Sequence, residues 1–168
     1  QSVESELRRT DGDLAQIPAR QSELEARLAA ERGRLDALKA SLDGSQKSRK
    51  REEGALQDLE AKRSKYKGQL MDVKTNKEYT AMLHEIEGVE REIRAREDQI
   101  LAEMESAETY AAELKTEEEV FRKEEARHKQ DVAALEGQRR ELTSRRERLA
   151  AEREQVARTV SPDVSELF

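Results

Sequence analysis

Apolar residues recur along this chain at alternating steps of three and four, the spacing that keeps one helical face on the seam of a left-handed coiled coil. Eighteen positions stepped in this way cover residues 14–73, and twelve of them are apolar. A second series starts at Tyr79 and keeps its phase over residues 79–160. One half of it repeats every seven residues from Tyr79 and Ile86 to Val156, and eleven of its twelve members are apolar. Two long helices therefore account for almost the whole chain.

The other half of the second series is predicted to lie four residues further on, at Leu83, Glu90, Glu97 and Met104. Long charged side chains can lay their stems along an apolar seam and keep their charged ends in water. This helix is therefore expected to bury only a narrow stripe. In this interpretation Tyr79, Leu83 and Ile86 begin the second seam.

The composition excludes an ordinary globular core, because 42% of the 168 residues are charged and only 3% are aromatic. The net charge of −6 comes from nearly balanced opposite charges, which predicts neither a nucleic-acid footprint nor an acidic tail. No apolar run approaches the length of a membrane span, and residues 1–30 lack the apolar core of a signal peptide. The absence of cysteine excludes disulfides and cysteine-based zinc sites within these residues.

The two seams lose phase once, because the step from Val73 to Tyr79 is six residues. Thr75, Asn76, Lys77 and Glu78 lie at this break and fit the S/T-x-x-E capping box. We therefore predict an all-α fold, a long antiparallel coiled-coil helical hairpin with its turn at residues 74–77. The first arm covers about residues 1–73 and the second about residues 78–160.

The charge distribution indicates the same antiparallel arrangement. Residues 45–77 carry ten Lys and Arg and five Asp and Glu, whereas residues 78–106 carry three Arg and nine Asp and Glu. Further from the turn, residues 1–30 have a net charge of −2 and residues 126–158 a net charge of +3. Opposite signs thus face each other across the arms. The pattern leaves open whether the arms pair within one chain or in an antiparallel homodimer.

Three segments depart from the pattern. Pro18 removes one backbone donor, so either the helix kinks there or Pro18 opens a long helix that follows a short one. Residues 43–54, which include Gly44 and Gly54, contain no apolar side chain, and we expect local loosening, a bend or a stutter there. The stretch is either a solvated, weakly packed part of the helix or a functional hinge. Ser161 and Pro162 form an N-cap followed by proline, which begins a separate short segment at residues 161–168.

No catalytic constellation is apparent. His84 and His128 lie 44 residues apart and cannot share a metal ion. The carboxylates lie on solvated helical faces, and neither a glycine-rich phosphate loop nor a Ser/His/Asp cluster is present. We expect no enzymatic activity, no metal site and no cofactor within these residues.

Two groups of residues are candidates for binding. Lys47, Arg49, Lys50 and Arg51 could contact phosphates, or could form the exposed side of a coiled coil balanced by nearby Glu. At the turn, Lys74, Lys77 and Tyr79 follow Lys65 and Lys67. These turn residues contact a partner, or Tyr79 and Leu83 simply close the end of the seam.

The stretch VKTNKEYTAMLHEIE at residues 73–87 resembles a signature of bacterial proteins that combine a coiled-coil hairpin with a C4-type zinc ribbon. Residues 17–28, IPARQSELEARL, and the ending SPDVSELF support the resemblance. It implies that a zinc-binding ribbon follows Phe168, and that zinc is the cofactor of that ribbon. Characterised members bind the sigma-54 factor, are associated with flagellar or type III secretion, and have been linked to RNA. The signature positions are Lys74, Asn76, Glu78, Tyr79, Ala81, Met82, Glu85 and Ile86.

These observations give three hypotheses. The first is a cytoplasmic, non-enzymatic adaptor that binds a protein partner, such as sigma-54 or secretion components, through the turn. The turn residues expected to contact the partner are Lys74, Asn76, Lys77, Glu78, Tyr79, Met82 and Glu85. The second is a nucleic-acid-binding protein that uses the ribbon and the basic patches. The third is a structural coiled-coil spacer.

Overall fold

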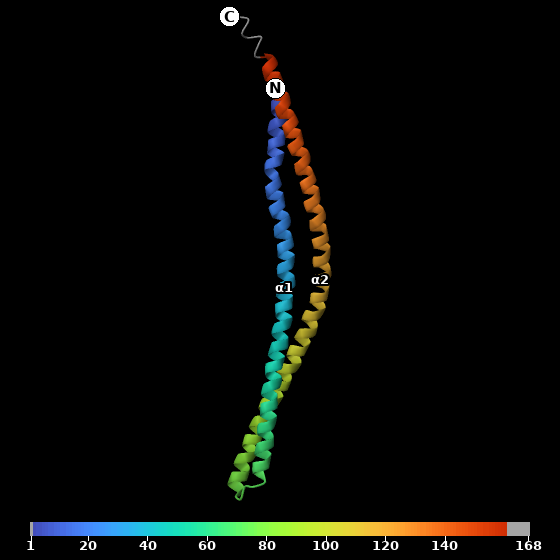
Figure 1. Cartoon of the computed structure of the whole chain (residues 1–168). Helices are drawn as coiled ribbons and strands as arrows, with labels where there is room; N and C mark the ends of the chain where they lie inside the picture. Colours follow the sequence, from blue (N-terminus) through green and yellow to red (C-terminus); the bar gives the residue numbers. More distant parts are fainter. Residues whose placement is uncertain (1, 161–168) are drawn as a thin grey trace. The chain divides into compact units, whose positions relative to one another are not determined.

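The computed structural model describes residues 2–160 and folds them into two helices (Figure 1). Helix α1 spans Ser2–Leu70, helix α2 spans Asn76–Val160, and residues 71–75 connect them. Both helices are rich in Glu, Lys, Arg, Ala and Leu, which have high helix propensity. The described residues include no strand, and the predicted all-α helical hairpin is confirmed. The predicted segment at residues 161–168 lies outside the described residues.

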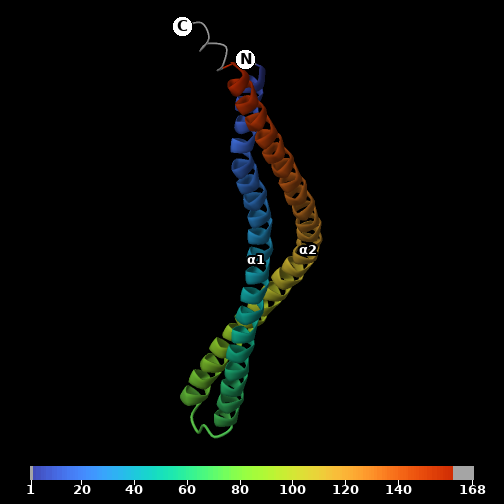
Figure 2. The same cartoon turned by 45° about the horizontal axis from the view of Figure 1, so that its top comes forward.

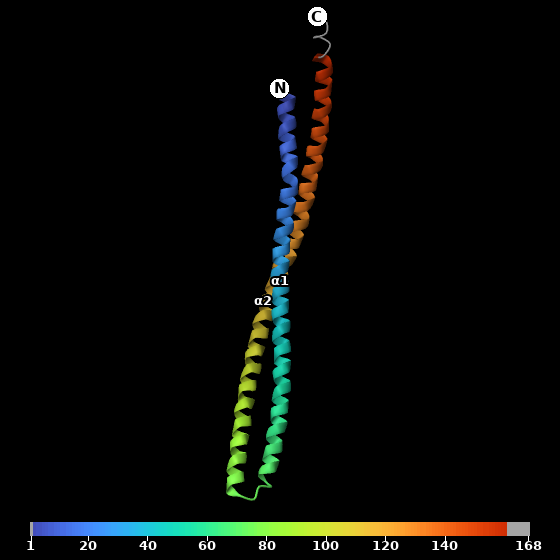
Figure 3. The same cartoon turned by 90° about the vertical axis from the view of Figure 1, so that its left-hand side faces the viewer.

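The chain divides into two compact units. The first, which we call the turn unit, is Arg34–Glu119, and the second, the end unit, combines Gln1–Gly33 with Val120–Phe168. In the turn unit, the cyan-green part of α1 and the green-yellow part of α2 run side by side up to the connecting turn (Figure 2). In the end unit, the blue start of α1 runs beside the red end of α2 (Figure 3).

The seam predicted for the first arm is the face that α1 buries. Every predicted position from Leu14 onward is buried or half-buried, with the exception of Gln21. The seam also extends further toward the N-terminus, because Leu7 and Thr10 are buried at the same spacing. The Thr10 hydroxyl donates a 2.8 Å hydrogen bond to the Glu6 carbonyl, so its burial leaves no unpaired donor.

The seam of α2 differs from the prediction in one of its two halves. The half that runs from Ile86 through Ile93 to Leu149 is buried or half-buried, as predicted. The other half lies three residues after the first, and not four. Its members from residue 89 to residue 131, apart from the exposed Arg96, are buried or half-buried: Val89, Glu103, Tyr110, Glu117, Glu124 and Asp131.

The polarity of these residues explains the wrong prediction. Most members of this half are charged, so counting apolar residues favoured Leu83 and Met104, which are exposed. Several of the charged members face α1 because they have polar partners there. Arg27 of α1 pairs with Glu124 at 2.9 Å, and Glu52 of α1 pairs with Arg96 at 2.7 Å.

Ion pairs between the helices show the antiparallel register within each unit. In the turn unit, Lys67 pairs with Glu90 at 3.6 Å, nearer the turn than the pair between Glu52 and Arg96. In the end unit, three arginines of α2 pair with acids near the start of α1: Arg145 with Glu6, Arg146 with Asp11 and Arg153 with Glu4. Basic and acidic segments therefore face each other as the charge pattern predicted. Such exposed pairs are evidence of the register, but each contributes little to stability.

Pro18 does not open a helix, so that alternative is wrong. Helix α1 continues through it from Ser2 to Leu70. Pro18 itself is exposed, while the preceding Ile17 is buried in the seam. A proline on the solvent side removes one backbone hydrogen bond without displacing the buried face.

Residues 43–54 are helical throughout and carry a set of buried or half-buried polar contacts. Ser45 is only 6% exposed, and its hydroxyl donates a 2.8 Å hydrogen bond to the Glu103 carboxylate. Ser48 donates a second bond to Glu103 at 2.9 Å. We call Ser45, Ser48, Glu52, Arg96 and Glu103 the polar layer. Most side chains of this stretch are exposed, as expected, but the expectation of weak packing is wrong at the seam, where hydrogen bonds stand in place of the missing apolar side chains.

The polar layer lowers the pKa of the Glu103 carboxyl. The hydrogen bonds from Ser45, Ser48 and Gln99 favour its charged form, and Arg51 adds a smaller electrostatic attraction. A carboxyl whose pKa is lowered on folding stabilises the fold above its pKa in the unfolded chain. This contribution is lost as the pH falls through the lower pKa of the folded chain.

We therefore expect Glu103→Gln to be less stable than the unsubstituted chain at about pH 7, and this difference to shrink below about pH 4. Urea unfolding followed by circular dichroism at a series of pH values measures it. The matched control is Glu108→Gln, an exposed position on the same helix. A stability difference at Glu103 that does not change with pH contradicts the expectation.

The seam is also expected to carry most of the stability. Ile93 is 4% exposed, and Ile93→Ala should lower the free energy of unfolding by about 2–4 kcal/mol through lost burial and the resulting cavity. Leu101 is 57% exposed on the same helix, and Leu101→Ala should change it by less than about 0.5 kcal/mol. Urea unfolding of both variants checks this. Equal losses would show that the Ile93 face is not the core.

Candidate functional site: the hairpin turn

The turn begins where the last turn of α1 tightens. The amide of Met71 donates to the Gly68 carbonyl at 3.2 Å, and the amide of Asp72 donates to the Gln69 carbonyl at 3.0 Å. Bonds of this i to i+3 type commonly close the end of a helix. The connection occupies residues 71–75, whereas the prediction placed it at 74–77. The predicted first arm extended to Val73, because Val73 lies at the seam spacing. Val73 is half-buried as a seam residue would be, but it lies outside α1.

Thr75 caps the start of α2. Its hydroxyl oxygen accepts a 3.2 Å hydrogen bond from the Glu78 amide, and its carbonyl accepts the first helical bond, from the Tyr79 amide at 3.0 Å. The predicted Thr75 cap is therefore confirmed, and it makes Asn76 the first helical residue. The reciprocal bond, in which the Thr75 amide would donate to the Glu78 carboxylate, is not formed in the described residues. The site has half of a capping box.

The residues that sequence reasoning assigned to partner binding divide into two groups. Lys74, Lys77 and Tyr79 are exposed, and so are Asn76, Glu78 and Glu85. Met82 is half-buried and belongs to the seam, since it lies four residues before the buried Ile86. The turn therefore brings together the polar signature residues and Tyr79 on its surface, and turns Met82 inward.

Tyr79 and Leu83 do not begin the second seam, and this correction has two causes. Tyr79 is 45% exposed because it lies where α1 has already ended at Leu70. Leu83 is 37% exposed because it lies on the flank of α2, four residues after position 79, whereas the second half of the seam follows the first by three residues. The seam begins instead with Met82 and Ile86. The alternative in which Tyr79 and Leu83 merely close the seam is therefore wrong.

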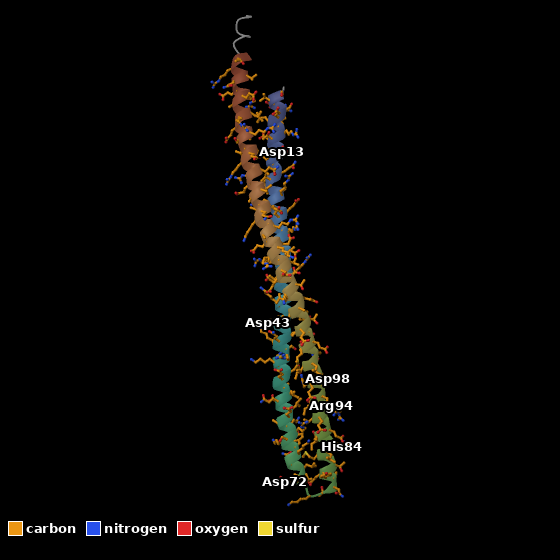
Figure 4. All side chains as sticks on the ribbon, turned by 90° about the vertical axis from the view of Figure 1, so that its right-hand side faces the viewer. Asp13, Asp43, Asp72, His84, Arg94 and Asp98 are labelled. Carbon is orange, nitrogen blue, oxygen red and sulfur yellow. The ribbon has the colours of Figure 1, made fainter. Side chains whose placement is uncertain are left out.

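Sequence reasoning missed one residue at the turn, Met71, which is 86% exposed. It precedes Asp72, which Figure 4 labels beside the turn, with His84 on the neighbouring part of α2. The available signal was that Met71 is a large apolar residue outside both seam series. We call Met71, Tyr79 and Leu83 the turn surface. These three residues have large apolar side chains that are exposed close to the turn.

The basic cluster at Lys47, Arg49, Lys50 and Arg51 lies along α1. Lys47 pairs with Asp43 at 2.7 Å, and Arg49 pairs with Glu53 at 3.2 Å, each within the same helix. Lys50 and Arg51 are exposed. Half of this cluster is therefore neutralised by neighbouring acids, as the exposed side of a coiled coil would be.

The histidines occupy separate environments on α2. His84 is exposed and lies 3.7 Å from the Glu87 carboxylate, whereas His128 is half-buried in the seam of the end unit. Across residues 2–160 no group of three or more His, Asp or Glu side chains is arranged to hold a metal ion. Over the same residues, neither helix is long and apolar enough to cross a membrane.

Comparison with protein families matches residues 1–168 to the CT398-like coiled coil hairpin domain. The match covers the whole chain, including both helices and the turn. Comparisons with curated proteins and with solved structures give no match.

Because Thr75 supplies the cap of α2, Thr75→Ala should lower the free energy of unfolding by about 1 kcal/mol. Thr80→Ala is the matched control, because the Thr80 hydroxyl bonds to the Asn76 carbonyl inside the helix and caps no free amide. Thermal and urea unfolding of the two variants measure the effect. A loss at Thr80 as large as that at Thr75 would rule out the cap as its cause.

Proposed function

The chain belongs to the CT398-like coiled coil hairpin domain family, and we propose that it is a non-enzymatic adaptor that binds a protein partner through the turn surface. The observation that carries the proposal is the exposure of Met71, Tyr79 and Leu83 at the turn. The chain contains three tyrosines and two phenylalanines, so a tyrosine outside the seam is an unusual use of an aromatic residue.

The chemistry of the turn supports binding to a protein. Tyrosine and methionine are enriched in the centres of protein interfaces, where a few residues provide most of the binding energy. Lys74 and Lys77 lie beside Tyr79 and form no ion pair within the described residues. They can therefore provide the polar rim of an interface. A hairpin turn also leaves these side chains free of cover from the facing helix.

The resemblance of residues 73–87 to the zinc-ribbon hairpin proteins suggests the class of partner. We propose the sigma-54 factor or a component of a secretion apparatus, in the cytoplasm, with a zinc ribbon as a second contact. The same proposal includes the absence of enzymatic activity. It is supported by the exposure of the acids of the turn, Asp72, Glu78 and Glu85, which lie in water and not in a catalytic pocket.

The proposal predicts that Tyr79→Ala weakens binding of the chain to sigma-54 factor at least about tenfold, and that Met71→Ser has an effect of the same direction. Isothermal titration calorimetry measures the affinity, and circular dichroism checks that helicity is unchanged. Leu101→Ala is the matched control, because Leu101 is an exposed apolar residue of the turn unit away from the turn.

Three outcomes would contradict the proposal. Unchanged affinity in both turn variants would show that the partner binds elsewhere on the chain. RNA binding that falls steeply with salt and is lost in Lys50→Ala/Arg51→Ala would identify a nucleic-acid-binding protein, because phosphate contacts release counterions. Binding of neither ligand would leave the spacer hypothesis.

A further inference from the structure

The polar layer repeats with the period of the coiled coil on both helices. Ser45 and Glu52 are seven residues apart on α1, and Glu103 and Arg96 are seven residues apart on α2 in the opposite direction. Ser45 bonds to Glu103 at 2.8 Å, and Glu52 bonds to Arg96 at 2.7 Å. The two pairs are therefore successive equivalent positions of one antiparallel seam, each occupied by a complementary polar pair.

We propose that the polar layer selects the register in which α1 and α2 pair in the turn unit. The apolar part of the seam does not select it. Leu38, Leu42, Leu56 and Leu59 on α1 are all leucines at the coiled-coil spacing. A slide of one helix by seven residues would place apolar side chains opposite apolar side chains again.

A slide of seven residues in one direction mismatches the polar layer. Glu52 would then face Glu103, and Ser45 would face Tyr110. Arg96 would face Leu59. This register brings two carboxylates together and leaves a guanidinium against an apolar side chain.

A slide in the other direction is mismatched in a different way. Glu103 would face Leu38, and Glu52 would face Val89. Ser45 would face Arg96. Two carboxylates would then lie against apolar residues with no donor opposite them. Only the observed register satisfies both pairs, which is how a single polar position fixes register in other coiled coils.

The turn alone is a weak restraint on such a slide. A slide toward the second mismatch unwinds the last turns of α1, and a slide toward the first unwinds the start of α2. The start of α2 contributes little packing, because Tyr79 and Leu83 are exposed there. The polar layer therefore supplies the discrimination that the apolar seam and the turn do not.

Disulfide trapping tests this register selection, because the chain has no cysteine of its own. Leu59→Cys with Val89→Cys reports the observed register, since these positions lie two heptads nearer the turn than Ser45 and Glu103. Tyr66→Cys with Val89→Cys reports the first slipped register. Each pair is equilibrated in a glutathione redox buffer, and disulfides within one chain are quantified.

The main comparison removes the polar layer. In Ser45→Leu/Glu52→Leu/Arg96→Leu/Glu103→Leu, we expect the slipped disulfide to increase by roughly tenfold to a hundredfold over the unsubstituted background, because no polar group of the seam is then mismatched. The melting temperature should rise at the same time, because leucines replace the buried Ser45 and the half-buried Glu52 and Glu103. No increase in the slipped disulfide, or an increase confined to disulfides between two chains, overturns the proposal.

A second set of variants tests register selection with charged residues kept in the polar layer. In Glu52→Arg the introduced guanidinium faces Arg96 in the observed register and Glu103 in the slipped one, so the slipped disulfide should increase. Adding Arg96→Glu should restore the observed register. Glu53→Arg makes the same charge change at an exposed position outside the seam and should leave the register unchanged. Failure of the Arg96→Glu rescue, or an equal effect of Glu53→Arg, overturns the proposal.

Discussion

Each helix of this chain has one narrow face to bury, and within each unit it has only the other helix to bury that face against. With 42% of its residues charged, the chain has no second apolar face from which a three-dimensional core could form. The buried apolar residues, such as Leu35, Val89 and Ile93, lie on this seam. The antiparallel register, the position of the turn and the exposure of the turn residues all follow from how the two seams meet.

The architecture could be predicted from the sequence, because the spacing of apolar residues identifies a coiled-coil seam. The seam of α1 is confirmed at every predicted position except Gln21, since twelve of its eighteen positions are apolar. The second half of the α2 seam could not be found in this way. Glu103, Glu124 and Arg96 lie on it because polar groups of α1 face them, and the spacing of one helix contains no information about the side chains opposite.

The turn shows the same limit at the level of single residues. The Thr75 part of the cap was predicted correctly, because a cap is a local interaction between neighbours in sequence, whereas the predicted bond to the Glu78 side chain is not formed in the described part of the chain. The exposure of Tyr79 depends on where α1 ends, and that end is determined by the i to i+3 bonds of Met71 and Asp72. Sequence spacing alone therefore assigned Tyr79 to the seam. The structure places it on the surface, and this turns a packing residue into a candidate contact residue.

Different interactions between α1 and α2 bear on the register in the two units. In the end unit, arginines of α2 reach exposed acids of α1, such as Glu6 and Asp11, and exposed pairs of this kind discriminate weakly between registers. In the turn unit the buried Ser45 hydroxyl bonds to a carboxylate of α2. A mismatch of a buried polar group costs more than a mismatch on the surface, because water cannot replace the lost partner. Register is therefore specified most strongly in the unit that carries the turn, where an error would alter which side chains the turn exposes.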